Sequence, residues 1–298
     1  MPKFRIARVI RSLRFLGIAG LAMGMALSMN SAYGQAKRLP PVADPDASAL
    51  IGRAENDLAR VIDAGPAFFD SSQGTVCPLD HENITRATVG PLVYTKMAQH
   101  LGAQPQPEIS RLVVLSGACP QGGTFNGPVE YITETTMRFT MDSVVSATET
   151  KQRSAGVFIN GNPIGDHVTY RWLLSSAFHR LASGELIEVK GEHPIRPSYS
   201  VFYQTLDSGS RLVRPSVNFS WIGGPGIQAM AIISREVDGE RVVTDSHYDG
   251  KLVSRTRYKN HQLHGWTENF QPELVKMGMG KQCYQNGQMV KAVECPDT

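Results

Sequence analysis

Apolar residues recur at helical spacing near the start of this chain and at strand-like spacing through the rest. Positions 50, 51, 54, 58, 61 and 62 carry Leu, Ile, Ala, Leu, Val and Ile, which form one stripe of a helix. Asp46 or Ser48 can cap the start of this helix, and Gly65 followed by Pro66 ends it. The pattern predicts an amphipathic helix that packs on the structure that follows.

Three further segments are less regular. A second helix is expected from Pro91 to Gly102, with its apolar residues facing inward. The segment 68–88 shows no clear period and is expected to form a loop. Residues 170–181 fit a helix and a buried strand equally well, so both alternatives stay open.

From Leu112 onward the pattern changes to short strands separated by turn pairs. These pairs are Asn126-Gly127, Asn160-Gly161, Ser183-Gly184, Ser208-Gly209, Asp238-Gly239, Asp249-Gly250, Asn260-His261 and Asn286-Gly287. Asn-Gly and Asp-Gly readily adopt the positive φ of a tight hairpin turn. The pairs at 238, 249 and 260 lie eleven residues apart, which is the spacing of an antiparallel meander. Spacings in the twenties elsewhere are typical of stacked two-strand repeats.

Two segments share one frame of aromatic, turn and glycine positions. Phe158-Ile-Asn-Gly161 is followed by Gly165 and Tyr170, and Tyr258-Lys-Asn-His261 is followed by Gly265 and Phe270. Tyr248-Asp-Gly-Lys-Leu252 and Tyr284-Gln-Asn-Gly-Gln-Met289 repeat parts of this frame. The pattern resembles the MORN-variant repeat of bacterial proteins that are often labelled antitoxin-like, most clearly over residues 245–291. The resemblance implies a twisted antiparallel sheet used for binding or scaffolding, and it implies no catalytic residues.

Residues 1–34 have the features of a secretory signal peptide. Five basic residues and no acidic one precede an apolar segment, Phe15 to Met29, and Ala32-Tyr33-Gly34 offers small residues for cleavage. The apolar segment is shorter than the roughly 20 residues that cross a bilayer, so no transmembrane span is expected in the mature protein. The sequence therefore predicts a periplasmic or secreted protein.

The rest of the chain divides into three parts. Residues 35–46 are expected to be a proline-rich linker, 47–110 a helical N-terminal region, and 111–298 a β-hairpin repeat region. The fold class predicted is mainly β, an antiparallel meander of MORN-like hairpins with a small helical N-terminal part.

Removal of the signal peptide changes the charge of the protein. The chain has 30 Lys and Arg and 27 Asp and Glu, and the five basic residues of the signal account for its positive balance. The remaining chain is slightly acidic, so its bulk charge gives no reason to bind nucleic acid.

The four cysteines all follow the predicted signal. An even number of cysteines in an exported chain favours disulfides. Three pairings are possible, and the pairs closest in sequence, Cys77–Cys119 and Cys283–Cys295, are preferred. No Cys-x-x-Cys motif supports a zinc or redox site.

Known chemical motifs are weak in this sequence. His261 and His264 are the closest pair of histidines. Three positions apart on a strand they point to opposite faces, whereas around a turn they could converge; no metal or other cofactor is predicted. Leu206-Asp-Ser-Gly-Ser210 reads as a hairpin turn rather than a catalytic serine loop. Ile222 to Gly226 lacks the lysine of a phosphate loop and reads as a kink between strands.

A candidate binding surface lies around the last repeats. Strict alternation places Leu252, Ser254, Thr256 and Tyr258 on one face and Lys251, Val253, Arg255 and Arg257 on the other. The aromatic and apolar residues Tyr258, Leu263, Trp266 and Phe270 are expected in the core, or alternatively in an exposed aromatic groove. Candidate partner-binding residues are Lys251, Arg255, Arg257, His261, His264 and Trp266.

These observations favour an exported, non-enzymatic binding or scaffolding protein of the cell envelope. Its expected partner is another protein, an envelope polymer or lipid headgroups. One alternative is a periplasmic hydrolase whose site is assembled from distant residues such as Asp80, His81 or His179. Another is a barrel-like binder of a small apolar ligand.

Overall fold

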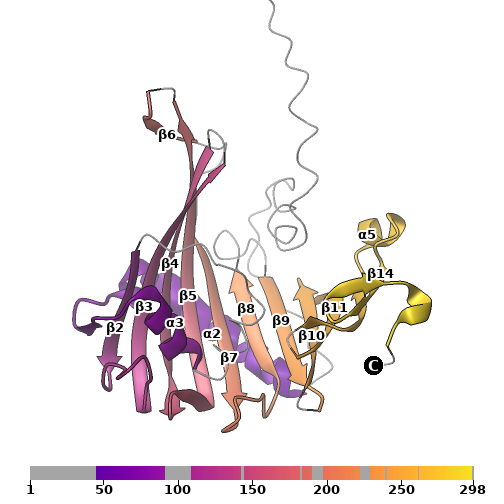
Figure 1. The fold of residues 1–298 in the computed structure, drawn as a ribbon, viewed down its shortest axis with the longest axis horizontal. Coiled ribbons are helices and arrows are strands. Elements are labelled where there is room, and N and C mark those ends of the chain that lie inside the picture. The colour runs from indigo at the N-terminus through magenta and orange to yellow at the C-terminus, as the bar shows by residue number, and fades with distance from the viewer. Residues whose placement is uncertain are drawn as a thin grey trace, which may run out of the picture. The chain divides into compact units, whose positions relative to one another are not determined.

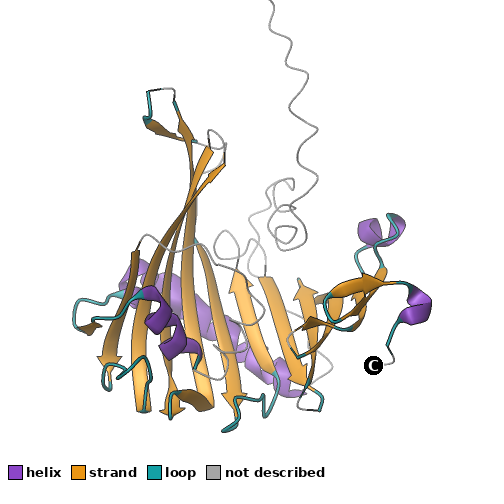
Figure 2. Cartoon of the chain, in the orientation of Figure 1, coloured by secondary structure: helices purple, strands orange, loops and turns teal. Residues whose placement is uncertain are grey.

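The computed structural model describes residues 45–90, 109–141, 144–181, 183–189, 197–221, 229–238, 240–260 and 262–296. Within these ranges the protein is mainly β, with one antiparallel sheet of 15 strands, an N-terminal helix and a few short helices (Figures 1 and 2). The expected signal peptide, nearly all of the expected linker, the helix expected from Pro91 and the kink at 222–226 lie outside the described residues.

The strands of the sheet follow one another along the chain. They are β1 (Thr75–Cys77), β2 (Ile109–Ser116), β3 (Gly127–Met141), β4 (Val144–Ile159), β5 (Asn162–Arg180), β6 (Leu186–Glu188), β7 (Ser198–Leu206), β8 (Ser216–Trp221), β9 (Ala229–Glu236), β10 (Arg241–Tyr248), β11 (Lys251–Lys259), β12 (Gln262–Leu263), β13 (Gly265–Asn269), β14 (Lys281–Gln285) and β15 (Gln288–Val290). Each pairs with its neighbour in sequence, except that β7 pairs with β5 and β13 with β11, while β6 and β12 branch off this path. The predicted antiparallel meander is therefore confirmed.

The first predicted helix is present as α2 (Pro45–Ala64). Its stripe is buried at Ile51, Ala54, Leu58 and Val61, as the spacing predicts. The predicted caps are wrong, because the helix already includes Asp46 and Ser48 and has a proline, which needs no N–H partner, at its first position. Gly65, with φ of +56°, ends the α-helix and starts the 3₁₀ turn η1 (Gly65–Phe69).

The two faces of the sheet are covered by different helices. α2 packs across β7 and β8, and the residues that it buries include Val201, Val217, Phe219 and Ile233, which are fully enclosed. α3 (His81–Val89) packs near β2 on the opposite face, in a second cluster with Leu112 and Phe125. Figure 1 shows α2 behind the sheet and α3 in front of it. We call the side covered by the first helix the α2 face.

The segment 68–88 is not the loop that the sequence suggests. It contains the end of η1, strand β1 and most of α3. The Asp80 carboxylate caps α3 by accepting the Asn83 N–H at 2.8 Å, and only Ile84 and Ala87 of this helix are buried. A nine-residue helix with two buried residues is too short to produce a visible apolar period.

The open alternative at 170–181 is resolved as strand. β5 runs from Asn162 to Arg180, and with β3 and β4 it extends beyond the neighbouring strands, with β6 at the far end (Figure 1). Within 170–180 only Trp172 is buried, and the side chains after it are half-buried or exposed on both faces, so the segment lacks the alternation that marks a half-buried strand.

Tight turns form at most of the predicted pairs within the described residues. Both members have positive φ at Asn160-Gly161, Asp249-Gly250 and Asn286-Gly287. Asn126-Gly127 is an exception, because Gly127 opens β3 and the Asn126 side chain instead accepts the backbone N–H of Asn160 at 2.8 Å. At 206–210 the chain forms a hairpin loop, as predicted, with the positive φ at Ser210.

One carboxylate ties α2 to the sheet. Asp57 accepts hydrogen bonds from the hydroxyl groups of Tyr170, at 3.3 Å, and Tyr203. Arg60 of the same helix contacts the other carboxylate oxygen at 2.6 Å. Burial raises the pKa of both tyrosines, and Asp57 adds to this effect. The two phenols therefore stay protonated and act as donors to the helix.

A buried histidine fills the space left by a glycine. Gly156 lies at a β-bulge between β4 and β5, where a Cβ atom would lie 2.0 Å from His167 Nδ1. His167 Nε2 is 3.0 Å from the Val157 carbonyl and 3.2 Å from the Ile164 carbonyl, so this nitrogen carries the proton and donates. The position therefore accepts no side chain.

We expect Asp57→Ala to lower the free energy of unfolding by about 2–3 kcal/mol, because it leaves the hydroxyl groups of buried Tyr203 and half-buried Tyr170 without their acceptor. Urea unfolding measures this change. Asp63→Ala, an exposed acid on the same helix, is the matched control and should change stability by less than about 0.5 kcal/mol. Equal effects of the two substitutions would show that the tether is unimportant.

We expect Gly156→Ala to destabilise the protein by about 2–3 kcal/mol, because the new methyl group overlaps the His167 ring. The control is Gly52→Ala in α2, where a Cβ meets nothing within 4 Å. There the same substitution should stabilise the protein by about 0.5–1 kcal/mol through helix propensity. Urea midpoints that move in the same direction for both variants would contradict this account.

Candidate functional site

A β-bulge in β11 divides the residues that the sequence places on one basic row. Across the β10–β11 ladder, Ser246 lies opposite Ser254, but His247 lies opposite Leu252. Val253 is therefore an extra residue in β11. Residues directly opposite one another share a face, so the bulge places Leu252 with His247 and separates it from Ser254. The prediction that Leu252 and Ser254 share a face is wrong for this reason.

The same bulge separates Lys251 from Arg255 and Arg257. Lys251 lies opposite Tyr248, on the face turned away from α2. Arg255 lies opposite Asp245, which in turn lies opposite Ile233 in the core under α2. The predicted row of three basic residues is thus wrong in its first member, because strict alternation fails at the bulge.

A row of alternating charges crosses the α2 face at this position. Asp245, Arg255, Glu268 and Lys281 lie directly opposite one another on β10, β11, β13 and β14. The row continues the apolar row that ends at Ile233 under α2. Charged side chains therefore begin at the strand next to the helix-covered core.

Asp245 is the buried centre of one half of this row. Arg255 binds it with two parallel hydrogen bonds, Nε to Oδ1 at 2.7 Å and Nη2 to Oδ2 at 3.1 Å. Arg235 Nη1 reaches Oδ2 at 3.2 Å. The Asp245 side chain is only 8% exposed, whereas both guanidinium groups are partly open to solvent. The hydrogen bond to Asp245 is the main cause of a raised Arg255 pKa, which keeps this guanidinium charged.

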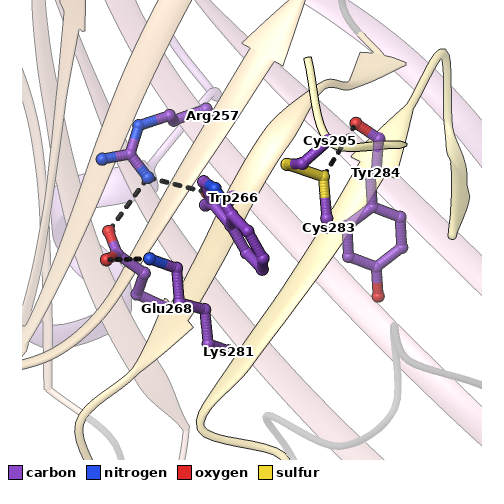
Figure 3. Close-up of a disulfide and its surroundings, with 7 residues drawn as sticks. All are labelled: Arg257, Trp266, Glu268, Lys281, Cys283, Tyr284 and Cys295. Atoms are coloured by element: carbon purple, nitrogen blue, oxygen red, sulfur yellow. Dashed lines mark hydrogen bonds and ion pairs between the residues drawn. A yellow bond between two sulfur atoms is a disulfide. The ribbon is translucent and has the colours of Figure 1, made fainter. Parts of the chain in front are cut away.

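Glu268 is the centre of the other half (Figure 3). Arg257 Nη1 lies 2.9 Å from Glu268 Oε2 and also donates to the Trp266 carbonyl oxygen at 2.8 Å. Lys281 Nζ lies 3.8 Å from Glu268 Oε1 and 4.3 Å from the centre of the Trp266 ring. The ammonium group is thus held by a carboxylate and by the face of an indole, and its side chain is about half exposed.

We call these six residues, Arg235, Asp245, Arg255, Arg257, Glu268 and Lys281, the charged cluster. Each of its two carboxylates is shared by two cations, so four positive charges face two negative ones. The guanidinium fork binds the oxygens of carboxylates and phosphates in pairs. The partly exposed cations of the cluster therefore have the chemistry to bind further anionic oxygens.

His247 lies on β10 two positions after Asp245 and on the same face, opposite Ala231 of the core. It is buried on the α2 face, and its Nδ1 has no hydrogen-bond partner among the described residues. Burial lowers the pKa of His247, Asp245 opposes this shift, and the nearby Arg235 and Arg255 add to it. The imidazole is therefore neutral at neutral pH and adds no charge to the cluster.

The structure brings together only some of the predicted partner-binding residues. Arg255 and Arg257 belong to the charged cluster, and Trp266 borders it. His264 is half-buried, and its backbone N–H donates to the Arg257 carbonyl. His261 lies outside the described residues. No group of three or more His, Cys, Asp or Glu side chains within the described ranges is placed to hold a metal ion.

The expected aromatic core at the C-terminal end is also wrong in part. Phe270 is 46% exposed, and Tyr258, Leu263 and Trp266 are only half-buried. The described part of the chain has no second helix over these strands, so their side chains are only partly covered, as where Lys281 lies over the Trp266 ring. Leu263 and Trp266 lie on opposite faces, with Gly265 at φ of +83° in the irregular step between β12 and β13.

The residues suggested for a hydrolase do not form one site. Asp80 caps α3, and His81 Nδ1 lies 3.2 Å from Ser110 Oγ, which fixes the start of α3 to β2. His179 lies near the end of β5, opposite Val144 and Ile187. The His81–Ser110 contact has no third described residue that orients it as a catalytic pair.

Both predicted disulfides are present. Cys77–Cys119 links β1 to the segment after β2, and Cys283–Cys295 links β14 to the segment after η2 (Ala292–Glu294). Figure 3 shows the second of these, and Cys283 lies opposite Trp266. The two bonds indicate an oxidising, extracytoplasmic compartment. Among the helices of the described ranges, none combines the length and apolar character needed to cross a bilayer.

Comparison with known proteins gives no relative: no family model, no curated protein and no solved structure matches this chain.

We expect the stability of the protein to fall as the pH is lowered from about 7.5 to about 5. The pKa values of buried His167 and His247 lie below the ordinary 6.5, so the unfolded chain takes up more protons in this range. The stabilisation is therefore complete above pH 6.5 and is lost below it. Urea unfolding at several pH values measures the slope.

His247→Asn should reduce this slope, because the variant has no group at this position that titrates in the range. His167→Asn should reduce it independently. A slope that is unchanged in both variants would show that these two histidines do not govern the pH dependence.

Proposed function

We propose that this protein is an exported, non-enzymatic binding protein of the cell envelope that holds an anionic partner on the charged cluster. The observation that carries the proposal is the sharing of each carboxylate, Asp245 and Glu268, by two cations. In a row of salt bridges with one cation for each carboxylate, the positive and negative charges would cancel. At Glu268 two cations face one carboxylate, so one positive charge is left over there, in a chain whose predicted mature form is slightly acidic.

Accessibility supports the same proposal. Lys281 is 53% exposed, Arg255 38% and Arg257 22%, so an anion can reach them without unfolding the sheet. The rigid ladder beneath fixes their spacing, which lowers the entropy cost of binding. The ligand class that fits is one with several phosphate or carboxylate groups, as in envelope polymers and lipid headgroups.

The sequence features are consistent with this role. The apolar N-terminal segment is proposed to be a cleaved Sec-type signal, and the hairpins of residues 245–291 are proposed to be MORN-variant repeats. A continuous antiparallel meander is the architecture that such repeats imply. The two disulfides fit a protein that works in the periplasm or outside the cell.

The proposal is tested with polyphosphate as the probe, titrated into the purified protein. Trp266 emission reports binding, because an anion that engages Lys281 changes the contact between its ammonium group and the indole ring. The Trp266→Phe variant lacks this response, so it shows how much of the emission change comes from Trp266 and how much from the other tryptophans. Affinity should fall as salt rises, since the site is partly exposed.

We expect the double variant Arg257→Gln, Lys281→Gln to bind polyphosphate at least roughly tenfold more weakly, because it removes two of the four cations of the charged cluster. Calorimetry measures the affinity. Glu268, left without these partners, is partly exposed and hydrated, so stability should change by only about 1 kcal/mol.

Arg211→Gln is the matched control, because this exposed arginine lies in the loop after β7. It should bind polyphosphate like the unchanged protein. Equal affinity of the double variant and the control would refute the proposed function.

A further inference from the structure

The loop between β13 and β14 exposes apolar side chains next to the charged cluster. It spans residues 270–280 and contains the short helix α5 (Pro272–Lys276), which stands beyond the ends of these strands in Figure 1. Phe270 is 46% exposed, Val275 51% and Met277 60%. Three large apolar side chains exposed on one short loop make it a candidate interaction surface.

The base of this loop is fixed by hydrogen bonds. The Asn269 backbone N–H donates to the Gly280 carbonyl at 2.7 Å, and its side-chain amide donates to the Met279 carbonyl at 2.9 Å. The Phe270 N–H donates to the carbonyl of Val253, the bulge residue, at 2.9 Å. The loop is thus held at both ends, with its apolar side chains presented to solvent.

The loop begins and ends at a charged pair of the cluster. Glu268 precedes it on β13 and Lys281 follows it on β14, where the two lie opposite each other. Within α5, Glu273 and Lys276 cancel in charge. The apolar loop therefore joins the two strands that carry Glu268 and Lys281 of the charged cluster.

We infer that the partner of this surface is an anionic lipid bilayer. The charged cluster binds the phosphate groups of the headgroups, while Val275, Met277 and Phe270 enter the boundary between headgroups and acyl chains. This inference rests on the proposed function and names the source of the anion. A soluble polyanion can satisfy the cations, but only a membrane offers an apolar phase for the loop.

Trp266 fits the same arrangement. Its ring lies under Lys281 and borders the cluster, and indole side chains favour the headgroup level of a bilayer. Each Lys or Arg near an anionic surface strengthens binding roughly fivefold. Exposed apolar side chains that enter the bilayer add a contribution that salt does not screen.

The experiment is co-sedimentation of the purified exported protein with vesicles of phosphatidylcholine, with or without phosphatidylglycerol. We expect binding only to the vesicles that contain phosphatidylglycerol. Val275→Ser with Met277→Ser should weaken this binding at least roughly tenfold, because both side chains lose their transfer into the apolar phase. The same variant should keep the affinity of the unchanged protein for polyphosphate.

Met289→Ser with Val293→Ser is the matched control. These two side chains are more exposed, 67% and 91%, and lie near the C-terminus rather than on the α5 loop. The control should bind vesicles like the unchanged protein. Equal binding by the loop variant and the control overturns the inference.

Two further outcomes separate this inference from the proposed function. Binding of polyphosphate without binding of anionic vesicles refutes the membrane as partner and leaves the anion site in place. Failure of the unchanged protein to bind either probe refutes both the membrane and the anion site.

Discussion

The hydrogen-bonded register between β10 and β11 determines what the C-terminal part of this protein can present. One extra residue, Val253, shifts the ladder between His247 and Ser246. A shift of one residue exchanges the faces of a strand, so the bulge decides which cations stand beside Asp245 and which point the other way. The carbonyl of the same residue also accepts a hydrogen bond from Phe270 and so fixes the loop that carries α5. The charged cluster and the apolar loop thus share one backbone feature.

The two carboxylates of the charged cluster hold its four cations in fixed positions. Asp245 is almost enclosed, and a buried carboxylate is tolerated only when its oxygens are bonded to cations. Arg255 supplies two parallel hydrogen bonds and Arg235 a third contact. Glu268 is more open and is shared by Arg257 and Lys281 in the same way. The sharing fixes the positions of the cations while leaving their outer edges accessible, which is the arrangement that we propose binds phosphate groups.

The length and position of α2 determine which part of the α2 face is covered and which part is exposed. α2 encloses the apolar rows of β7 and β8 and is tied down by the contact of Asp57 with Tyr170 and Tyr203. At β10 the row changes from Ile233 to Asp245, and no helix of the described residues packs on the strands that follow. Side chains on those strands meet solvent, so polar and charged residues replace the apolar ones. The core and the candidate binding surface are therefore successive parts of one face.

The sequence by itself determined the local structure whose causes lie within a few residues. The apolar stripe from Leu50 to Ile62 predicted α2, turn pairs such as Asn160-Gly161 and Asp249-Gly250 predicted hairpins, and proximity along the chain predicted both disulfides. The helix and the hairpins rest on helical spacing and positive φ, which one chain segment reveals, whereas the disulfides rest on the even number of cysteines and their order along the chain.

The tertiary structure alone decided the partners across strands. Strict alternation grouped Lys251 with Arg255, and only the ladder shows the bulge that separates them. The sequence could not show that Arg255 lies in one row with Asp245, Glu268 and Lys281. Their alignment depends on the pairing registers of β10 with β11, β11 with β13 and β13 with β14, which local residues do not specify. The helix α3 was missed because it is short and buries only two residues, and the strand at 170–181 was left open because its pairing with β4, β6 and β7 is set by distant segments. Contacts between segments far apart in the chain are set by the packing of the whole sheet, which no single stretch of residues encodes.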